Sequence, residues 1–122
     1  MTTLVYVRPT VDKDQGLVGN EVTPGSTAET SIVSISAPSG HGIAVTGIIL
    51  TGKSGGLFRI KYKIGADVKT QTLYLPSAGS IVMSPEDISR SLKGRVSKEV
   101  EVTVEPDSTG VLYAASIEYR VV

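Results

Sequence analysis

An eight-residue string, Gly47–Ser54, matches the nucleotide-binding P-loop pattern G-x-x-x-x-G-K-[ST] at each fixed position. In a working P-loop Lys53 binds the β- and γ-phosphates, Ser54 binds Mg²⁺, and the loop leads from a strand into a helix. Here the variable positions hold the apolar run Ile-Ile-Leu-Thr, which favours a strand, and two glycines, poor helix formers, follow the string. The alternating segment Leu57–Ile64 comes next, so the string crosses a strand and a hairpin turn. The fixed positions that we interpret as a chance match, with no cofactor bound, are Gly47, Gly52, Lys53 and Ser54.

Histidine and cysteine are too rare in this chain to build most catalytic or metal sites. There is no cysteine, and His41 is the single histidine, so thiolate sites, disulfides and multi-histidine metal sites are excluded. Asp12 and Asp14 lie close together but lack the further oxygen ligands and closing glutamate of a calcium loop. We predict a protein that is not an enzyme and has no catalytic residues and no metal. His41, between two glycines in a turn, is either an exposed loop residue or a contact at a symmetry axis or partner surface.

Charge balance and hydropathy restrict the possible partners. Twelve basic side chains are matched by twelve acidic ones, whereas a nucleic-acid-binding domain normally shows a basic excess. No apolar run approaches the ~20 residues that span a bilayer. The start, Met-Thr-Thr-Leu-Val-Tyr-Val-Arg, lacks the basic-then-apolar order of a signal peptide. We predict no nucleic-acid partner, no membrane partner, and synthesis in the cytoplasm without secretion by the general route.

The elements that position these residues are short β-rich runs separated by glycine, proline and serine, a pattern typical of an all-β sandwich or barrel. The segment Ser84-Pro85-Glu86-Asp87 offers a capping serine, a proline for the first helical position and acids for the first turn. It predicts one short helix near residues 85–92. The predicted strands are Leu4–Arg8, Thr30–Ser36, Ile43–Thr51, Leu57–Ile64, Val68–Leu75, Ser80–Ser84, Lys98–Glu105 and Val111–Val121.

About eight strands in a chain of 122 residues suit a single antiparallel β-sandwich, either a jelly roll or an immunoglobulin-like fold. The absence of cysteine and tryptophan removes the hallmarks of an antibody-type domain, so we predict an all-β, jelly-roll-like sandwich. The nearly continuous apolar run Ile43–Thr51 predicts a buried central strand. Residues 1–26 are predicted to be an N-terminal strand and extended arm, and residues 27–122 the sandwich domain.

Strand alternation places charges on two outward faces. In Leu57–Ile64 the larger apolar residues fall on one face, and Arg59, Lys61 and Lys63 fall on the other. This basic stripe is either the solvated face of a hairpin or a contact for an acidic partner or polyanion. Glutamates occupy the outward face of Lys98–Glu105. The two stripes can meet across one sheet or between subunits.

The apolar start of the chain includes Leu4 and Tyr6. This segment is either an ordinary sheet strand or a strand that adds to the sheet of a neighbouring subunit. The possible partner contacts are therefore Leu4, Tyr6, His41, Arg59, Lys61 and Lys63.

The layout resembles the small jelly-roll proteins of tailed phages and related viruses, of the capsid decoration or cement type. The resemblance covers most of residues 27–122: a short N-terminal arm, glycine-flanked strands as in Thr51–Tyr62, and the closing strand Val111–Tyr119. It rests on layout, with no diagnostic motif. It implies a non-enzymatic structural protein of the virion, made in the host cytoplasm, that forms a homotrimer and binds a capsid lattice, with residues 1–26 as the attachment arm. The alternative is a ligand-binding β-sandwich such as a carbohydrate-binding module, for which Tyr6 and Tyr74 are the tyrosines not assigned to inward faces.

Overall fold

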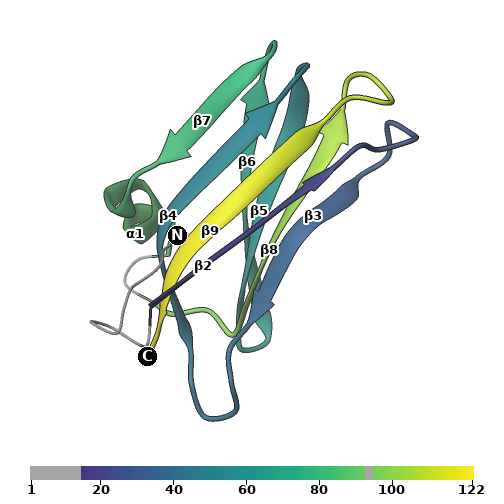
Figure 1. Cartoon of the computed structure of the whole chain (residues 1–122). Coiled ribbons are helices and arrows are strands. Elements are labelled where there is room, and N and C mark those ends of the chain that lie inside the picture. Colours follow the sequence, from purple (N-terminus) through teal and green to yellow (C-terminus); the bar gives the residue numbers. More distant parts are fainter. Residues whose placement is uncertain (1–14, 93–94) are drawn as a thin grey trace, which may run out of the picture.

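Two four-stranded antiparallel sheets face each other in the computed structural model, which describes residues 15–92 and 95–122 (Figure 1). The front sheet, which faces the viewer in Figure 1, has the strand order β2-β9-β4-β7, and the back sheet has the order β3-β8-β5-β6. The predicted strand Leu4–Arg8, with the predicted contacts Leu4 and Tyr6, lies outside the described residues. The elements are β2 (Gln15–Val22), β3 (Thr30–Ser36), β4 (Ile43–Gly52), β5 (Gly56–Ile64), β6 (Asp67–Leu75), β7 (Gly79–Met83), α1 (Pro85–Leu92), β8 (Glu99–Pro106) and β9 (Tyr113–Val121).

The strand order follows from a nested pairing. Strand β5 pairs with β6, β4 with β7, β3 with β8 and β2 with β9, all of them antiparallel. A chain paired in this way is one long folded hairpin whose successive strand pairs fall alternately in the two sheets, which is the jelly-roll arrangement. The predicted all-β, jelly-roll-like antiparallel sandwich of about eight strands with one short helix is confirmed for the described residues.

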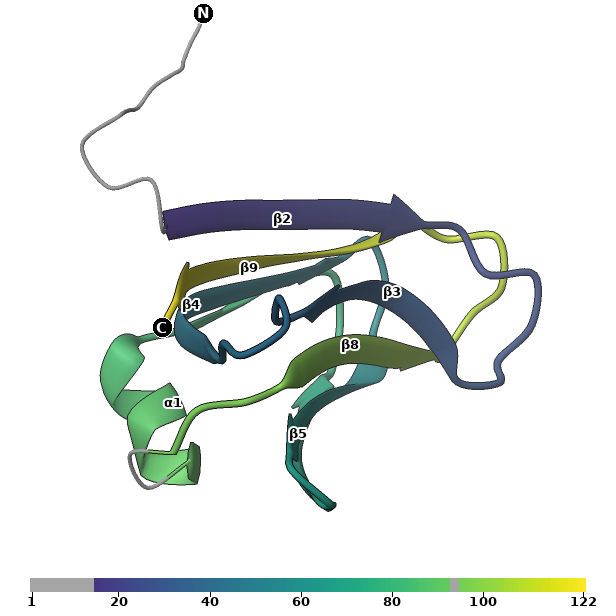
Figure 2. The same cartoon turned by 90° about the horizontal axis from the view of Figure 1, so that it is seen from below.

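The core lies between the two sheets and is built by strand alternation. Strand β5 points Phe58, Ile60 and Tyr62 inward, and all three side chains are fully buried. Figure 2 shows the two layers from below, with α1 at one end of the sandwich. Burial raises the pKa of the Tyr62 hydroxyl. The other hydrophobic side chains that are at most 1 % exposed are Ile43, Ile48, Leu50, Ile88, Val100, Val102, Val104, Tyr113 and Ile117.

Helix α1 begins where the sequence predicts, because Ser84 and Asp87 cap it reciprocally. The Ser84 hydroxyl accepts a hydrogen bond from the backbone N–H of Asp87 at 3.2 Å, and the Asp87 carboxylate accepts one from the backbone N–H of Ser84 at 3.1 Å. The bond from the Ser84 backbone N–H, followed by one that the Ser84 hydroxyl donates to the same carboxylate at 2.9 Å, holds the pKa of Asp87 below its ordinary value. Ile88 and Leu92 on the inner face of the helix join the core.

Strand β2 corrects the predicted extent of the N-terminal arm. Residues Gln15–Val22, predicted to belong to an arm that ends at residue 26, are paired along their whole length with β9. Gly16 and Gly19 make this strand difficult to predict from the sequence, since glycine has low strand propensity. A Cβ atom on Gly16 would lie 2.4 Å from the ring of Tyr119, so any other residue at this position requires the Tyr119 side chain to move. The sandwich therefore includes part of the predicted arm.

Candidate interaction surfaces

The predicted basic stripe lies on the outer face of the back sheet, and its charges are paired within the molecule. Lys61 Nζ lies 2.8 Å from a carboxylate oxygen of Glu29, Arg59 Nη1 lies 2.6 Å from Glu105, and Lys63 Nζ lies 3.3 Å from Glu99. Strands β5 and β8 are direct neighbours, so the two predicted stripes meet across one sheet. This face is consequently a mixed-charge surface.

Glu29 is the centre of this ion-pair cluster. Its carboxylate accepts a hydrogen bond from the Thr103 hydroxyl at 2.6 Å and has Arg59 at 3.7 Å besides its bond to Lys61. The bond from Lys61, followed by that from Thr103, holds the pKa of Glu29 below its ordinary value. In the same cluster, the hydrogen bond to Glu105 raises the pKa of Arg59. Mutual pairing of this kind reduces the charge available to a polyanion.

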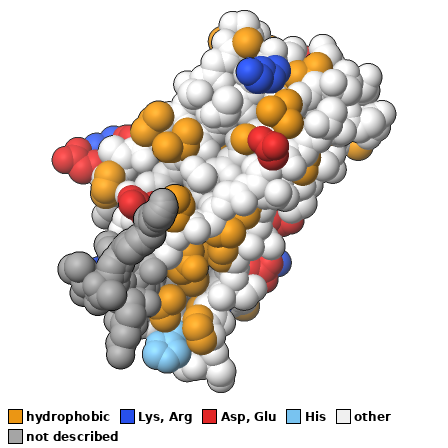
Figure 3. Space-filling view, in the orientation of Figure 1, with side chains coloured by type: hydrophobic (Ala, Val, Ile, Leu, Met, Phe, Trp, Pro, Cys, Tyr) orange, Lys and Arg blue, Asp and Glu red, His pale blue; other side chains and the backbone are white. Residues whose placement is uncertain are grey.

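The outer face of the front sheet has a different character, because it carries fewer charges: among its outward side chains Glu21, Glu118 and Arg120 are charged. Figure 3 looks onto this face and shows several hydrophobic side chains on it, with few charged groups. Ile49 of β4 lies directly opposite Val82 of β7, and the two are 47 % and 69 % exposed. Leu17 of β2 is 73 % exposed. The surrounding outward positions of β2, β9, β4 and β7 include Gly19, Gly47, Thr51, Ser80, Ala114 and Ser116.

Two adjoining hollows shape this face, and Ile49 contributes to both. The larger one, about 430 Å³, is lined by Leu17, Ile49, Val82 and Pro85, with Glu118 at its side. The second hollow lies over Gly19, Thr51, Ala114 and Ser116. We call this surface, made of the outward side chains of β2, β9, β4 and β7, the front face. It is a shallow, apolar and accessible surface.

The exposure of Ile49 corrects the prediction that Ile43–Thr51 is a strand buried on both faces. Strand β4 is central in its sheet, between β9 and β7, but no described element covers the outer side of Ile49. The pairing of β4 with β9 shifts register between Val45 and Gly47. This bulge lets Val45 and Ile48 both point inward. Sequence reasoning missed the front face because the apolar run showed no alternation.

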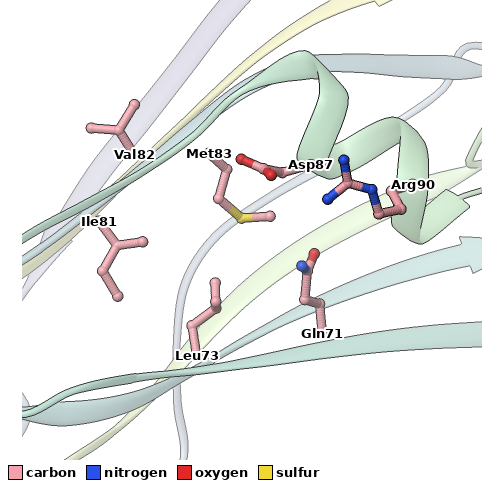
Figure 4. A pocket seen from close by; sticks show the side chains of 7 residues that line it. All are labelled: Gln71, Leu73, Ile81, Val82, Met83, Asp87 and Arg90. Atoms are coloured by element: carbon pink, nitrogen blue, oxygen red, sulfur yellow. The ribbon is translucent and has the colours of Figure 1, made fainter.

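A third surface is a groove at the side of the sandwich, between the edge strands β6 and β7 and beside α1 (Figure 4). Gln71 and Leu73 of β6 point across it towards Met83 and α1, which contributes Asp87 and Arg90. The Gln71 side-chain oxygen is buried without a hydrogen-bond partner among the described residues. A buried amide oxygen that accepts no hydrogen bond destabilises the folded state. A bound group that donates a hydrogen bond to this oxygen would remove that cost.

The P-loop-like string Gly47–Ser54 belongs to strand β4 and to the turn that follows it. Gly47 and Gly52 lie within strand β4, and Lys53 and Ser54 lie in the turn that follows. Strand β5 begins at Gly56, so a strand and not a helix follows the string. Because β4 and β5 belong to different sheets, the turn is a crossing between sheets, which corrects the predicted hairpin. The glycines allow this crossing: a Cβ atom on Gly55 would lie 2.7 Å from the backbone oxygen of Leu75.

The remaining predicted contact, His41, is exposed in the connection between β3 and β4. Its backbone oxygen accepts a hydrogen bond from Lys98 Nζ at 2.8 Å. Within residues 15–92 and 95–122, no group of three or more histidine, cysteine, aspartate or glutamate side chains is arranged to hold a metal ion. In the same residues, α1 is far too short and polar to cross a membrane, and no other helix is present.

Comparison with known proteins supports the fold and leaves the function open. No family model matches the sequence, and no curated protein is similar to it. Among solved structures, the chain is similar to the crystal structure of PirA, with a TM-score of 0.50 and 11 % sequence identity. The match covers 85 % of this chain and 93 % of PirA. At this identity the likeness concerns the fold alone.

Proposed function

We propose that this protein is a non-enzymatic structural protein that assembles with other proteins through its front face. The observation that supports this is the contiguity of Ile49 and Val82, both well exposed, on a surface that carries few charges. Antiparallel sheets that face water normally carry polar outward side chains, whereas contiguous exposed apolar patches mark interaction sites. A flat face of small residues lets another protein surface approach the sheet closely.

The form of this role that we propose is a virion component of the capsid decoration type, in which homo-oligomers, trimers by expectation, bind a capsid lattice. Jelly rolls are the common fold of viral capsid domains, which supports this assignment by analogy of fold. The partners are other copies of the chain and a capsid protein. Neither nucleic acid nor membrane is proposed as a partner.

Sedimentation velocity of the full chain tests the assembly role. The proposal expects a species of three chains, and at least of more than one, with a mass that is a multiple of 12.8 kDa. The double variant Ile49→Glu, Val82→Glu places charge at the centre of the front face and is expected to lower this mass. Val122→Glu, at a position 47 % exposed and outside the front face, is the matched control and is expected to behave as wild type. A wild-type chain that remains monomeric at millimolar concentration refutes the proposal.

The alternative function is a ligand-binding module such as a carbohydrate-binding domain, and one observation favours it. The groove beside α1 combines apolar walls with the unpartnered oxygen of Gln71. Tyr74, 58 % exposed, is the aromatic side chain available on the neighbouring outer surface. A glycan array with clear binding that is lost in Tyr74→Ala, from a chain that is monomeric, supports this alternative over assembly.

A further inference from the structure

Strand β6 is a long and weakly protected edge. It runs for nine residues, Asp67–Leu75, and ends the back sheet, with β5 on one side and no described strand on the other. Exposed edges are normally blunted by short strands, prolines, bulges or charges, lysine above all, because their unpaired backbone groups invite another strand. The corresponding edge of the front sheet, β7, has only five residues. Strand β6 contains no proline, and Lys69 is its single charge between the terminal residues.

The outward face of β6 is apolar at both ends and uncharged throughout. Opposite the outward side chains of β5 lie Val68, Thr70, Thr72 and Tyr74. Val68 is 52 % exposed and Tyr74 58 % exposed. Two large exposed side chains at symmetric positions of one edge strand form a self-complementary surface, as a two-fold contact requires.

We propose that two copies of this chain pair edge to edge through β6, antiparallel, about a two-fold axis at Gln71. In this register Val68 of one copy lies opposite the partner's Tyr74, Thr70 opposite the partner's Thr72, and Gln71 opposite the partner's Gln71. Aromatic–β-branched and threonine–threonine pairs are both favourable between antiparallel strands. If the axis moves by one residue along β6, outward side chains still lie opposite outward side chains, but the Val68–Tyr74 contacts are lost. These contacts therefore specify the register.

The inward side of β6 supports the same register. The Gln71 side-chain oxygen is buried and has no donor among the described residues, and the amide of the partner's Gln71 supplies one at the axis. The partner's Lys69 lies opposite Leu73, which shares the groove with Asp87 (Figure 4). The lysine stem can therefore cover Leu73 while its ammonium group stays at the polar end of the groove, where Asp87 and Arg90 lie. The groove is then the inner side of the contact.

The two back sheets become one continuous eight-stranded sheet in this arrangement, with backbone hydrogen bonds across the axis. The β6 contact rests on the proposed assembly of several chains and is one of the contacts within that assembly. A two-fold contact alone gives a dimer, and together with a three-fold contact it gives an assembly of six chains. In both cases, loss of the β6 contact halves the mass of the particle.

Charge substitutions at the threonine pairs test the contact directly. Thr70 and Thr72 are exposed and outward, so the variants Thr70→Lys, Thr72→Lys and Thr70→Glu, Thr72→Glu leave the core intact. Each variant alone places like charges opposite each other in both pairs, and sedimentation velocity is expected to show half the wild-type mass. A 1:1 mixture places lysine opposite glutamate and is expected to restore the wild-type mass.

The matched control puts the same charges on the other edge of the back sheet. Ser34→Lys, Ser36→Lys alters two exposed outward positions of β3 and is expected to leave the mass unchanged. A wild-type species of three chains, or a larger oligomer whose mass is the same in both threonine variants, refutes the β6 contact while the proposed function stands. A monomeric wild type refutes both.

A cross-link provides a second test that does not depend on the charged variants. The chain has no cysteine, and at the axis the Cα atoms of the two Gln71 residues would lie about 4.5–5.5 Å apart, within reach of a disulfide. Gln71→Cys is expected to form covalent dimers under mild oxidation, in most of the chains. Ser34→Cys on β3 is expected to remain largely monomeric on a denaturing gel. Equal, low cross-linking in the two variants contradicts the proposed axis.

Discussion

Replacement of Gly55 by alanine tests whether the glycines around the P-loop-like string serve the fold. A Cβ atom on Gly55 would lie 2.7 Å from the backbone oxygen of Leu75, 2.8 Å from that of Pro76 and 2.7 Å from a carboxylate oxygen of Asp107. Two of these three atoms belong to the backbone and cannot rotate away. The backbone of Gly55 lies outside the left-handed region, so the cost of the substitution arises from this steric conflict.

We expect Gly55→Ala to lower the free energy of unfolding by about 3 kcal/mol, the upper end of the usual cost of overpacking. This is a large part of the roughly 5–15 kcal/mol that stabilises a typical domain. With a urea m-value of about 2 kcal/mol per M, the midpoint of unfolding falls by about 1.5 M. Equilibrium urea denaturation followed by circular dichroism measures both quantities.

Two control variants separate this explanation from others. Gly25→Ala adds the same methyl group where no atom lies within 4 Å, and its stability is expected to be unchanged or raised by about 0.4–1 kcal/mol. Lys53→Ala removes the lysine of the string at an exposed position, and its stability is expected to change by less than about 0.5 kcal/mol. If Gly55→Ala unfolds within about 0.5 kcal/mol of wild type, our interpretation of this crossing is wrong.

Three further substitutions test single interactions. In Tyr113→Phe the 2.6 Å hydrogen bond from the tyrosine hydroxyl to the Gly55 oxygen is lost, and since that oxygen keeps a bond from Asp107, we expect a cost of about 1 kcal/mol in urea denaturation. Ser84→Ala removes the helix cap and is expected to cost about 1 kcal/mol, with no loss contradicting the capping role. Ion pairing lowers the pKa of Glu29 in the folded state. The carboxylate therefore stabilises the fold fully at pH values above its unfolded-state pKa, near 4.5. This stabilisation is lost as the pH falls through its folded-state pKa. Glu29→Gln is therefore expected to flatten the decline of the urea midpoint in this acidic range, and an unchanged decline counts against the ion-pair cluster.

The back sheet could be predicted from sequence because its strands alternate. In β5 the inward side chains that follow Gly56 are large and apolar, whereas Arg59, Lys61 and Lys63 face outward, so the alternation identifies the two faces. The helix could be predicted for a similar reason, since Ser84 and Asp87 carry a local signal. Neither prediction depended on distant parts of the chain.

The front sheet was harder to predict because its pattern depends on tertiary contacts. Gly16 lies where the ring of Tyr119 occupies the space of a Cβ atom, and no local rule contains that information. The bulge between Val45 and Gly47 changes which side chains of β4 face inward, so the exposure of Ile49 could not be inferred from periodicity. The candidate front face was missed for this reason. The basic stripe, in contrast, was located correctly, but its pairing with Glu29 required the fold.

The nested strand pairing has a kinetic consequence. Its innermost pair, β5 with β6, closes a short turn in which Ile64 lies opposite Asp67, whereas in the outermost pair Gln15 lies opposite Arg120. Each successive pair closes a longer loop than the one inside it, and loop closure becomes entropically more costly with length. Chains dominated by such distant pairings fold slowly, within about milliseconds to seconds. Until β2 and β9 join, the partly folded chain exposes the edge of a growing sheet, and this is the interval in which it is most vulnerable to aggregation.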